Sequence, residues 1–528
     1  MKRILFAFLL VFFAVSASFA QQRYENPIIP GFYPDPSICR VGDDYFIVNS
    51  TFHYFPAVPL WHSKDLVHWT QIRNVLDRES QVNLSGAMRW SGIYAPTIRY
   101  DESDGTYYMV TTNVTNGGNF FVTTKDPWGG WSEPVFLQQQ GIDPSFYFEN
   151  GICYMLSNPD NCIHLCTVDK KTGKQLSPSR PLWKGTGGRY PEAPHIFKKD
   201  GWYYLLISEG GTEYGHMVTI ARSRGIYGPY KANPANPILT HRDMVTQSSP
   251  IQATGHADMV QAPDGSWWMV CLGIRPQDGQ NHLLGRETFL APVRWEKGKW
   301  PVVNETGTIS LKMSANLPFW NPMVPEATKI LFSSAPLGPE WVYVRNPQME
   351  NYENRDGTLV LHGTDATLDA TEKSPTMVLR RQRDINCEVN ASLMLSAAES
   401  GDEAGLSVFL DACKHYDVFV RENGDSRSVV LRYRLDYLTH IEKEAEIPSD
   451  SKVRFCIRCG NDSYSFFYSI GEETSFVHLG TMGARYLSEE VQGGFTGCMF
   501  GLYCISAGGT AVAGFDSFDI AKGASRPD

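Results

Sequence analysis

The sequence predicts an all-β protein in which a five-bladed β-propeller is followed by a β-sandwich. The composition is the first observation, because 28 Phe, 25 Tyr and 13 Trp together with 46 Gly and 32 Pro are typical of a turn-rich β protein. The second is a hairpin pattern that recurs five times before residue 300. The third is a series of short alternating strands after residue 328.

The net charge indicates which partners to expect, and the length indicates how many domains the chain forms. The 528 residues include 47 Lys and Arg against 57 Asp and Glu, a formal net charge of −10. A mildly acidic chain is a poor ligand for a polyanion, so we expect no nucleic-acid partner. With 42% hydrophobic residues the chain is not mainly disordered. At about 150 residues per domain, the length predicts two or more domains.

Residues 1–20 have the pattern of a secretory signal peptide. Lys2 and Arg3 precede an apolar run at 4–15, and the small residues Ser18 and Ala20, three before and one before the cut, provide a cleavage site after Ala20. The run is shorter than the about 20 apolar residues that span a bilayer. Residue 21 is Gln rather than the Cys that a bacterial lipoprotein acylates. We therefore expect an exported chain, in the periplasm or secreted, without a membrane anchor.

The hairpin pattern begins with a small or acidic residue, usually before Pro, and continues through a tight polar turn into an aromatic-rich strand. The five copies open at Asp35, Ala95, Asp143, Ala193 and His256. Each copy is typical of two strands joined by a tight turn. Repeats of this length made of short strands are typical of propeller blades. Residues 21–312 are therefore predicted to form five blades.

Propeller geometry places the start of every copy at one mouth of the central channel, because the innermost strand of each blade runs beside the axis. Asp35 opens the first copy, Asp143 opens the third, and Glu192 precedes the fourth. Three carboxyl groups that are distant in sequence are thus predicted to share a pocket. Clustered carboxylates repel one another, so their pKa values separate and provide an acid and a base at one pH.

The chain after the repeats predicts a second domain. A Pro-rich segment at 313–327 interrupts the pattern and is interpreted as a linker. From 328 to 528, short alternating strands separated by turns such as Arg355-Asp356-Gly357 predict a β-sandwich. No catalytic group of residues stands out there. The loop at 493–497 is a candidate to reach over the pocket of the propeller.

Other chemistries find little support in the sequence. The 11 Cys are scattered and Cys456-x-x-Cys459 is the only CxxC pair, so free buried thiols are expected rather than a zinc site, with one or two disulfides as an alternative. The sequence contains no GxSxG, HExxH or GxxxxGK[ST] motif. Serine-hydrolase, zinc-protease and P-loop chemistries are therefore not indicated.

A set of motifs between residue 26 and about residue 295 resembles glycoside hydrolase family 43. The motifs are NPI at 26–28, GFYPDPS at 31–37, NSTF at 49–52, HSKDLVHW at 62–69, GIYAP at 92–96, PEAPHI at 191–196, TGHAD at 254–258 and LGRETFLAPV at 284–293. The C-terminal part resembles the concanavalin-like sandwich appended to family members. Ala193 and Ala257 stand where Gly is frequent in the family, and each is a small residue replacing a small one.

The resemblance implies roles for the three carboxyl groups. Asp35 matches the general base, which activates water. Glu192 matches the general acid, which protonates the leaving oxygen. Asp143 matches a third carboxylate that orients the acid and tunes its pKa. Catalysis by inversion requires a separation of about 6.5–9.5 Å between acid and base, so that a water molecule fits.

The resemblance also implies how the sugar and a metal are held. Arg286 matches an arginine that binds the sugar, and it could equally favour the ionised state of Asp35. Phe52 and Tyr94 match aromatic walls of the sugar pocket. His256 matches a central histidine that holds a hydrated calcium ion in many members. No catalytic cofactor is implied, only this structural Ca²⁺.

These features together predict an inverting exo-glycosidase. The expected reaction removes non-reducing-end α-L-arabinofuranosyl residues from plant cell-wall polysaccharides or oligosaccharides of the xyloglucan or arabinoxylan type, with β-D-xylosidase side activity. One alternative is a β-1,4-xylosidase acting on xylo-oligosaccharides. Two others are a non-catalytic carbohydrate-binding protein and a retaining fructan hydrolase, whose propeller also has five blades. The sequence does not indicate the oligomeric state.

Overall fold

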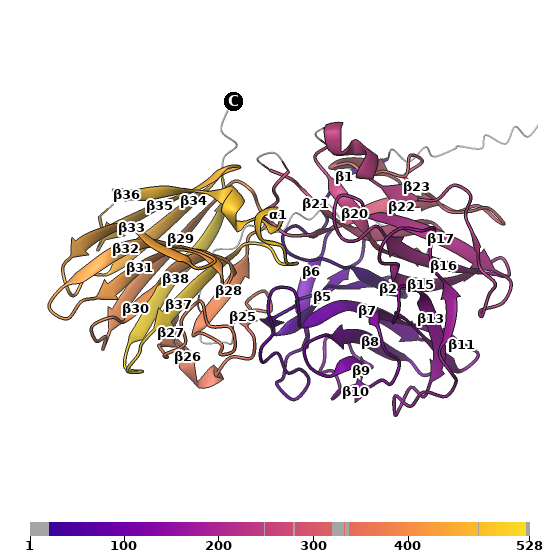
Figure 1. Ribbon diagram of the computed structural model, residues 1–528, viewed down its shortest axis with the longest axis horizontal. Helices are drawn as coiled ribbons and strands as arrows, with labels where there is room; N and C mark the ends of the chain where they lie inside the picture. The colour runs from indigo at the N-terminus through magenta and orange to yellow at the C-terminus, as the bar shows by residue number, and fades with distance from the viewer. Residues whose placement is uncertain are drawn as a thin grey trace, which may run out of the picture.

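The computed structural model describes residues 21–247, 249–277, 280–318, 332, 337–473 and 475–523. Almost all of its elements are strands, and they form two domains that lie side by side, one coloured indigo to magenta and the other orange to yellow (Figure 1). The predicted signal peptide at 1–20 lies outside the described residues. Within them, no helix combines the length and the apolar character needed to cross a membrane.

The N-terminal domain contains five antiparallel sheets, each with four main strands that follow chain order across the sheet. Blade 1 consists of β2 (Ser37–Val41), β3 (Asp44–Val48), β5 (Ala57–Ser63) and β6 (Thr70–Leu76). Blade 2 consists of β7 (Ile93–Asp101), β8 (Thr106–Asn113), β9 (Gly118–Thr124) and β10 (Val135–Phe136). Blade 3 consists of β11 (Ile142–Glu149), β12 (Ile152–Asn158), β13 (Ile163–Val168) and β14 (Arg180–Trp183).

The last two blades complete the ring. Blade 4 consists of β15 (Glu192–Lys199), β16 (Trp202–Glu209), β17 (Met217–Ser223) and β18 (Lys231–Ala232), with β19 (Leu239–Thr240) also on β17. Blade 5 consists of β20 (Gln252–Gln261), β21 (Trp267–Ile274), β22 (Glu287–Arg294) and β23 (Val302–Val303). The first strands contact one another in a closed circle, β2 to β7, β11, β15, β20 and back to β2. This circular order confirms the predicted five-bladed propeller.

The N-terminal segment ties the ends of the ring together. The strand β1 (Gln22–Glu25) pairs with β24 (Lys312–Ala315), and the Asn26 side-chain amide bonds both the N–H and the C=O of Leu290 in blade 5 at 2.9 and 3.0 Å. The predicted linker at 313–327 therefore begins inside β24. Its residues from 319 onward lie outside the described part of the chain.

The residue that opens each sequence repeat has a left-handed backbone. The φ angles are 53° at Asp35, 21° at Ala95, 54° at Asp143, 51° at Ala193 and 42° at His256. In blades 2 to 5 a register shift in the pairing of the first two strands accompanies this residue. Such bulges redirect side chains at the end of a strand. The repeat therefore encodes a bend at the channel mouth of every blade.

The C-terminal domain is a sandwich of two antiparallel sheets. The first has the order β26 (Tyr352–Arg355), β27 (Thr358–His362), β38 (Val512–Lys522), β29 (Cys387–Ser396), β34 (Val453–Cys459), β35 (Ser463–Ile470) and β36 (Val477–Gly483). The second has the order β28 (Met377–Arg381), β37 (Met499–Ile505), β30 (Glu403–Asp411), β31 (Lys414–Glu422), β32 (Arg427–Leu435) and β33 (Leu438–Ile447). The C-terminal domain also contains the short 3-10 helices η2 (Met349–Asn351) and η3 (Ala484–Leu487) and the helix α1 (Glu489–Gln492). A further 3-10 helix, η1 (Arg242–Gln247), lies in the propeller between β19 and β20.

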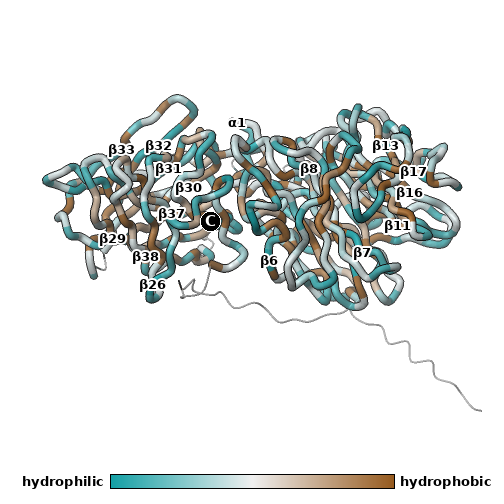
Figure 2. Tube along the Cα trace, turned by 90° about the horizontal axis from the view of Figure 1, so that it is seen from below, coloured by the Kyte–Doolittle hydropathy of each residue, from teal (hydrophilic) through white to brown (hydrophobic). Residues whose placement is uncertain are grey.

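Burial of alternating apolar side chains holds the sandwich together. Leu393, Leu406, Val418 and Phe455 are fully buried between its two sheets. Figure 2 shows the same pattern in both domains, with hydrophobic residues along the strands and hydrophilic residues at many of the outer loops. All 11 cysteines are free and ten of them are buried, as the scattered spacing predicts.

The two domains share a buried interface. The strand β25 (Tyr343–Val344) pairs with β4 (Tyr54–Phe55) of the propeller. Arg89 of the propeller and Asp411 of the sandwich form a buried ion pair at 2.6 Å. An apolar cluster spans the boundary and includes Phe32, Phe52, Tyr54, Val342, Val344, Phe409, Phe419 and Met499. The sandwich is therefore fixed against the face of the propeller that carries Phe52.

Candidate active site

A cavity of about 510 Å³ lies at the mouth of the channel, and all seven side chains predicted for the site line it. These residues are Asp35, Phe52, Tyr94, Asp143, Glu192, His256 and Arg286. The carboxyl groups come from three blades, because Asp35 lies just before β2, Asp143 lies in β11 and Glu192 begins β15. A left-handed residue lies at Asp35, at Asp143 and directly after Glu192. These bends bring side chains that are distant in sequence into one cavity.

Asp35 is buried and its carboxylate has several partners. Its Oδ1 accepts a hydrogen bond from Arg286 Nη1 at 2.8 Å and lies 3.6 Å from His256 Nδ1, while its Oδ2 accepts one from the Ser50 hydroxyl at 2.6 Å. Burial alone would raise the pKa of Asp35. The charge of Arg286, the proximity of His256 and the Ser50 hydrogen bond outweigh burial and hold this pKa below its ordinary value. Asp35 is therefore ionised at neutral pH.

Asp143 and Glu192 have the opposite electrostatic surroundings. Burial is the main cause that raises the pKa of both carboxyl groups, and neighbouring carboxylates raise it further, while His256 opposes the rise. Asp143 Oδ2 also accepts the backbone N–H of Ala193 at 3.1 Å, next to Glu192 in the chain. The pocket therefore contains one carboxyl group with a lowered pKa and two with raised pKa values, a separation typical of acid–base sites.

Arg286 connects Asp35 to other parts of the cavity wall. Its Nη1 donates to Asp35 and to the Thr212 hydroxyl at 3.0 Å, and its Nη2 donates to the Phe495 carbonyl oxygen at 3.4 Å. The side chain is almost completely buried. In this structure Arg286 supports the ionised state of Asp35, which is one of the two roles that the sequence left open.

Three aromatic rings form one wall of the cavity. The Phe52 centroid lies 5.2 Å from that of Tyr94 and 5.5 Å from that of Phe495, with which it stacks at 29°. Phe495 belongs to the sandwich and follows α1. The prediction that the loop at 493–497 reaches the pocket is therefore confirmed, and the second domain closes one side of the cavity.

Ionic contacts attach this loop to the propeller. His282 Nδ1 lies 2.5 Å from Glu490 and its Nε2 lies 3.2 Å from Glu489. Burial lowers the pKa of His282, but the two carboxylates outweigh burial and raise it to about 10, so the imidazole is charged. Arg89 donates to the Gly493 carbonyl oxygen at 3.0 Å. Phe495 is thus held by a segment with several fixed contacts.

Three residues of the site were not predicted. Ser50 donates a hydrogen bond to Asp35 and stands in the NSTF motif, so its place in that motif near Phe52 was the only signal. Thr212 bonds Arg286 and His216 lies 3.5 Å from Glu192 Oε1. Both follow β16 in a loop that belongs to no repeat, so the sequence contains no signal for them.

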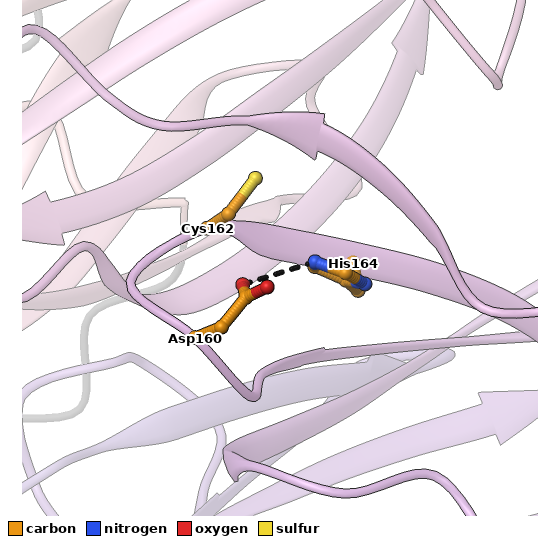
Figure 3. Close-up of side chains that lie close together, drawn as sticks. All are labelled: Asp160, Cys162 and His164. Carbon is orange, nitrogen blue, oxygen red and sulfur yellow. Dashed lines mark ion pairs between the residues drawn. The ribbon is translucent and has the colours of Figure 1, made fainter.

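Asp160, Cys162 and His164 form a compact group at the turn before β13, and Asp160 also lies on the rim of the cavity (Figure 3). Asp160 is engaged in an ion pair with His164 at 3.0 Å. The Cys162 thiol contacts the carbonyl oxygens of Trp183 and Ile163, and burial raises its pKa, which disfavours the thiolate that a metal ion requires. We interpret this group as a stabilising contact of the turn.

His256 belongs to a second compact group, with Asp143 and Glu192, whose possible ligand atoms all lie within 4.8 Å of one another. Carboxylate oxygens, which calcium prefers, are therefore close to this imidazole. Arg99 of blade 2 pairs with Asp258 of blade 5 at 2.7 Å and contacts His195 Nδ1 of blade 4 at 2.8 Å, so a fixed cation lies between these inner strands. The structural calcium ion that the resemblance implies through His256 stays a prediction.

A larger cavity of about 970 Å³ lies between blade 1 and residues 337–359. Its carboxyl groups are largely exposed, and its described lining contains neither Arg nor His. Acid–base chemistry requires carboxyl groups whose pKa values are separated by burial and by charged neighbours. We therefore assign the chemistry to the smaller cavity.

Comparisons with known proteins agree with this geometry. The model of glycosyl hydrolases family 43 matches residues 24–301, and that of the beta xylosidase C-terminal concanavalin A-like domain matches residues 329–521. A non-reducing end alpha-L-arabinofuranosidase of Bacteroides ovatus is 40% identical over 96% of both chains. A xylosidase/arabinosidase of Butyrivibrio fibrisolvens is 38% identical over 92% of this chain and 96% of its own.

Solved structures show the same relationship in three dimensions. The structure described as Bacteroides ovatus xyloglucan PUL GH43B is 40% identical, has a TM-score of 0.89 and is covered completely, with 95% of this chain aligned. A GH43 protein from Bacillus licheniformis is 34% identical with a TM-score of 0.87 over 95% of this chain and all of its own. The protein is thus a two-domain member of glycosyl hydrolase family 43.

Proposed function

We propose that the protein is an exported, inverting exo-glycosidase that removes non-reducing-end α-L-arabinofuranosyl residues from plant cell-wall polysaccharides or their oligosaccharides. The observation that carries the proposal is the group of three carboxyl groups in one cavity, Asp35 and Asp143 buried and Glu192 partly buried, whose pKa values are separated. The name of the Bacteroides ovatus relative supports the choice of sugar. The aromatic wall that includes Phe495 supports a terminal sugar, because it closes one side of the pocket.

In the proposed reaction Asp35 is the general base and Glu192 is the general acid. Asp35 takes a proton from a water molecule, whose oxygen attacks the anomeric carbon of the sugar. Glu192 gives its proton to the glycosidic oxygen as the bond to the leaving group breaks. Because water attacks the face opposite the leaving group, the configuration at the anomeric carbon is inverted. Each of these proton transfers contributes about 10²–10⁴-fold to the rate.

Asp143 and Arg286 support the proposed acid and base. The hydrogen bond from Ala193 N–H fixes Asp143 beside the backbone of Glu192, and burial together with the Asp35 carboxylate raises the pKa of Glu192, which favours the protonated acid. Arg286 keeps Asp35 ionised. Its remaining donors and the rings of Phe52 and Tyr94 are placed to contact the sugar. The calcium ion implied by the family resemblance has no part in these steps.

The second candidate function is a β-1,4-xylosidase acting on xylo-oligosaccharides. Several relatives carry xylosidase names, including a Bacillus subtilis beta-xylosidase that is 30% identical over 93% of this chain. A terminal xylopyranose and a terminal arabinofuranose present similar hydroxyl patterns to one pocket. The pocket of about 510 Å³ accommodates either sugar.

A side-by-side assay tests both candidates. Hydrolysis rates of p-nitrophenyl α-L-arabinofuranoside and p-nitrophenyl β-D-xyloside are measured with the wild-type protein and with Glu192→Ala. We expect a higher kcat/KM on the arabinofuranoside and a loss of both activities in the variant. A preference for the xyloside would favour the second candidate. The absence of activity on any pentoside would favour a non-catalytic carbohydrate-binding protein.

We also propose that the chain is exported to the periplasm or the medium after cleavage behind Ala20. The support is the charged, apolar and small-residue pattern of residues 1–20. Mass spectrometry of the protein purified from its native cells tests this, with Gln21 expected as the first residue. A mature protein that retains Met1 in the cytoplasm would contradict the proposal.

A further inference from the structure

We propose that His216 is a positioning residue for Glu192: its Nε2 accepts a hydrogen bond from the protonated carboxyl group and so retains the acid form until the substrate oxygen takes the proton. The inference rests on the acid role proposed above for Glu192. It concerns a buried histidine that belongs to no motif and no repeat of the sequence.

The His216 ring has a fixed orientation and a fixed tautomer. It lies directly before β17 and is fully buried. Its Nδ1 lies 3.2 Å from the Ala253 carbonyl oxygen of blade 5. Because a carbonyl oxygen only accepts, Nδ1 carries the hydrogen and Nε2 presents a lone pair. The ring packs on Gly255, where a Cβ atom would lie 2.3 Å from it.

The lone pair of His216 faces the acid. Nε2 lies 3.5 Å from Glu192 Oε1 and accepts no hydrogen bond from any of the described residues. Buried polar atoms in proteins are normally satisfied. A protonated Glu192 provides the missing donor, whereas an ionised carboxylate would place a negative oxygen against a lone pair. The contact therefore favours the acid form.

Burial leaves His216 neutral. Burial is the main cause that lowers its pKa to about 4, and the charge of Arg286 adds to this, while the Ala253 carbonyl oxygen and Asp35 oppose it. His216 therefore acts through a hydrogen bond and not through a charge. The other titratable or charged groups that act on Glu192, on His216 or on Asp143 are Asp35, His256 and Arg286, and Asp143 itself lies within 4.8 Å of the Glu192 carboxyl group.

The hydrogen bond is compatible with proton donation to the substrate. In the free enzyme the proton resides on the Glu192 oxygen that faces His216. When substrate binds, rotation of the carboxyl group turns the O–H toward the glycosidic oxygen. The proton moves to that oxygen, the O–H electron pair stays on Glu192, and the bond to the anomeric carbon breaks. A proton from water restores the acid, and the His216 lone pair favours its return.

The first test is His216→Gln, which places an amide N–H near the former lone pair and so stabilises ionised Glu192. We expect the basic limb of the kcat/KM profile to move to lower pH. At pH 7 a pentoside with an alkyl leaving group should lose about tenfold or more in rate. The 2,4-dinitrophenyl pentoside, which needs no acid, should change by less than about twofold. Equal losses on both substrates or an unmoved limb would overturn the inference.

Two controls separate this inference from the proposed function. His241 is equally buried, with Nδ1 2.8 Å from the Ile251 carbonyl oxygen and Nε2 accepting the Ile309 N–H at 2.9 Å, so His241→Gln controls for lost packing and should leave the limb in place. Glu192→Ala tests the acid itself. If it slows both leaving groups equally, the acid role fails. If Glu192→Ala slows mainly the alkyl pentoside, while His216→Gln slows both substrates equally, only the role of His216 fails.

A measurement on the unmodified protein covers the case in which His216→Gln does not fold. In protein labelled with ¹⁵N at histidine, the His216 Nε2 resonance should remain that of a neutral imidazole. It should shift as Glu192 loses its proton, at the same pH as the basic limb of the rate profile. A His216 resonance that is insensitive to this step, or one that shows a protonated imidazole at neutral pH, contradicts the proposal.

Discussion

Two acidic residues in one cavity acquire different protonation states because their partners differ. Asp35 faces a guanidinium group and a hydroxyl donor. Glu192 faces other carboxyl groups and the neutral His216. Burial raises the pKa of both side chains, so burial alone does not separate them. The separation comes from the hydrogen bonds of Arg286 and Ser50, which both go to Asp35, although the charge of Arg286 also acts on Glu192.

Replacement of Arg286 by Ala should move the whole pH profile upward. Arg286 lowers the pKa of Asp35 and also opposes the rise at Glu192, so its removal raises both values. The base then requires a higher pH to ionise, and the acid stays protonated to a higher pH. Both limbs of kcat/KM are expected at higher pH than in the wild type.

The matched control is Arg275→Ala, which also removes an ion-paired arginine, in this case a partly buried one that pairs with Glu287 at 2.6 Å. It should lower thermal stability without moving either limb. An acidic limb that stays in place or moves to lower pH in Arg286→Ala would show that this cation does not set the charge of Asp35.

The site residues could be predicted only where the sequence repeats or matches a motif. Asp35 and Asp143 open repeats and Glu192 precedes one, so propeller geometry brings them together without knowledge of a single contact. Ser50 and His216 act through contacts between blades or across one loop. Such contacts depend on three-dimensional packing and leave no periodic trace in the sequence.

At the scale of elements, the first strand of each blade combines a regular ladder with a bend at its channel end. The left-handed residue at the start of each repeat is Asp, Ala or His, and none is Gly. Such residues occupy this conformation at a cost that the surrounding structure offsets. The bend is therefore a built feature that places Asp35, Asp143 and Glu192 at the rim of the cavity.

Ala193 provides a direct test of this bend. A β-branched side chain at φ 51° is strained, so Ala193→Val should destabilise the protein by about 1–3 kcal/mol and lower activity by displacing Glu192. Gly adopts this conformation freely, so Ala193→Gly should leave both properties close to wild type. Thermal unfolding and kcat/KM are the measurements. Equal behaviour of the two variants would contradict the role of the bend.

The inner strands also carry the cation of the channel. Arg99 of β7 bonds the Ser37 hydroxyl at 3.1 Å and pairs with Asp258 of β20. Because no step of the proposed reaction uses a metal ion, we expect dialysis against a chelator to leave activity unchanged. Arg99→Met should cost about 3–5 kcal/mol by leaving Asp258 unpaired. A loss of activity on chelation that calcium restores would show that a metal ion is bound after all.

At the scale of the molecule, one site is assembled from two domains. The propeller contributes the carboxyl groups, and the sandwich contributes Phe495 on a loop that His282 and Arg89 hold in place. The repeat predicted five blades and the alternating strands predicted a sandwich. The sequence did not predict the ion pairs between domains, because Arg89 and His282 resemble ordinary surface residues when their partners are unknown.

Loss of the Phe495 ring should weaken substrate binding without changing the acid–base chemistry. Aromatic contacts of this kind contribute about 0.5–1.5 kcal/mol, so Phe495→Ala should raise KM by about 2- to 13-fold. The limbs of the pH profile should not move, because no titratable group is removed. Tyr486→Ala is a control, since this aromatic side chain of the sandwich is exposed. An unchanged KM would exclude Phe495 from the sugar pocket.

The central claim is that Asp35 directs water to the anomeric carbon while Glu192 releases the leaving group from the opposite face. The most direct test is proton NMR of the first-formed sugar when the enzyme hydrolyses an α-L-arabinofuranoside, recorded before mutarotation. The account predicts that β-L-arabinofuranose appears first. Initial release of the α anomer would reveal net retention and contradict the claim.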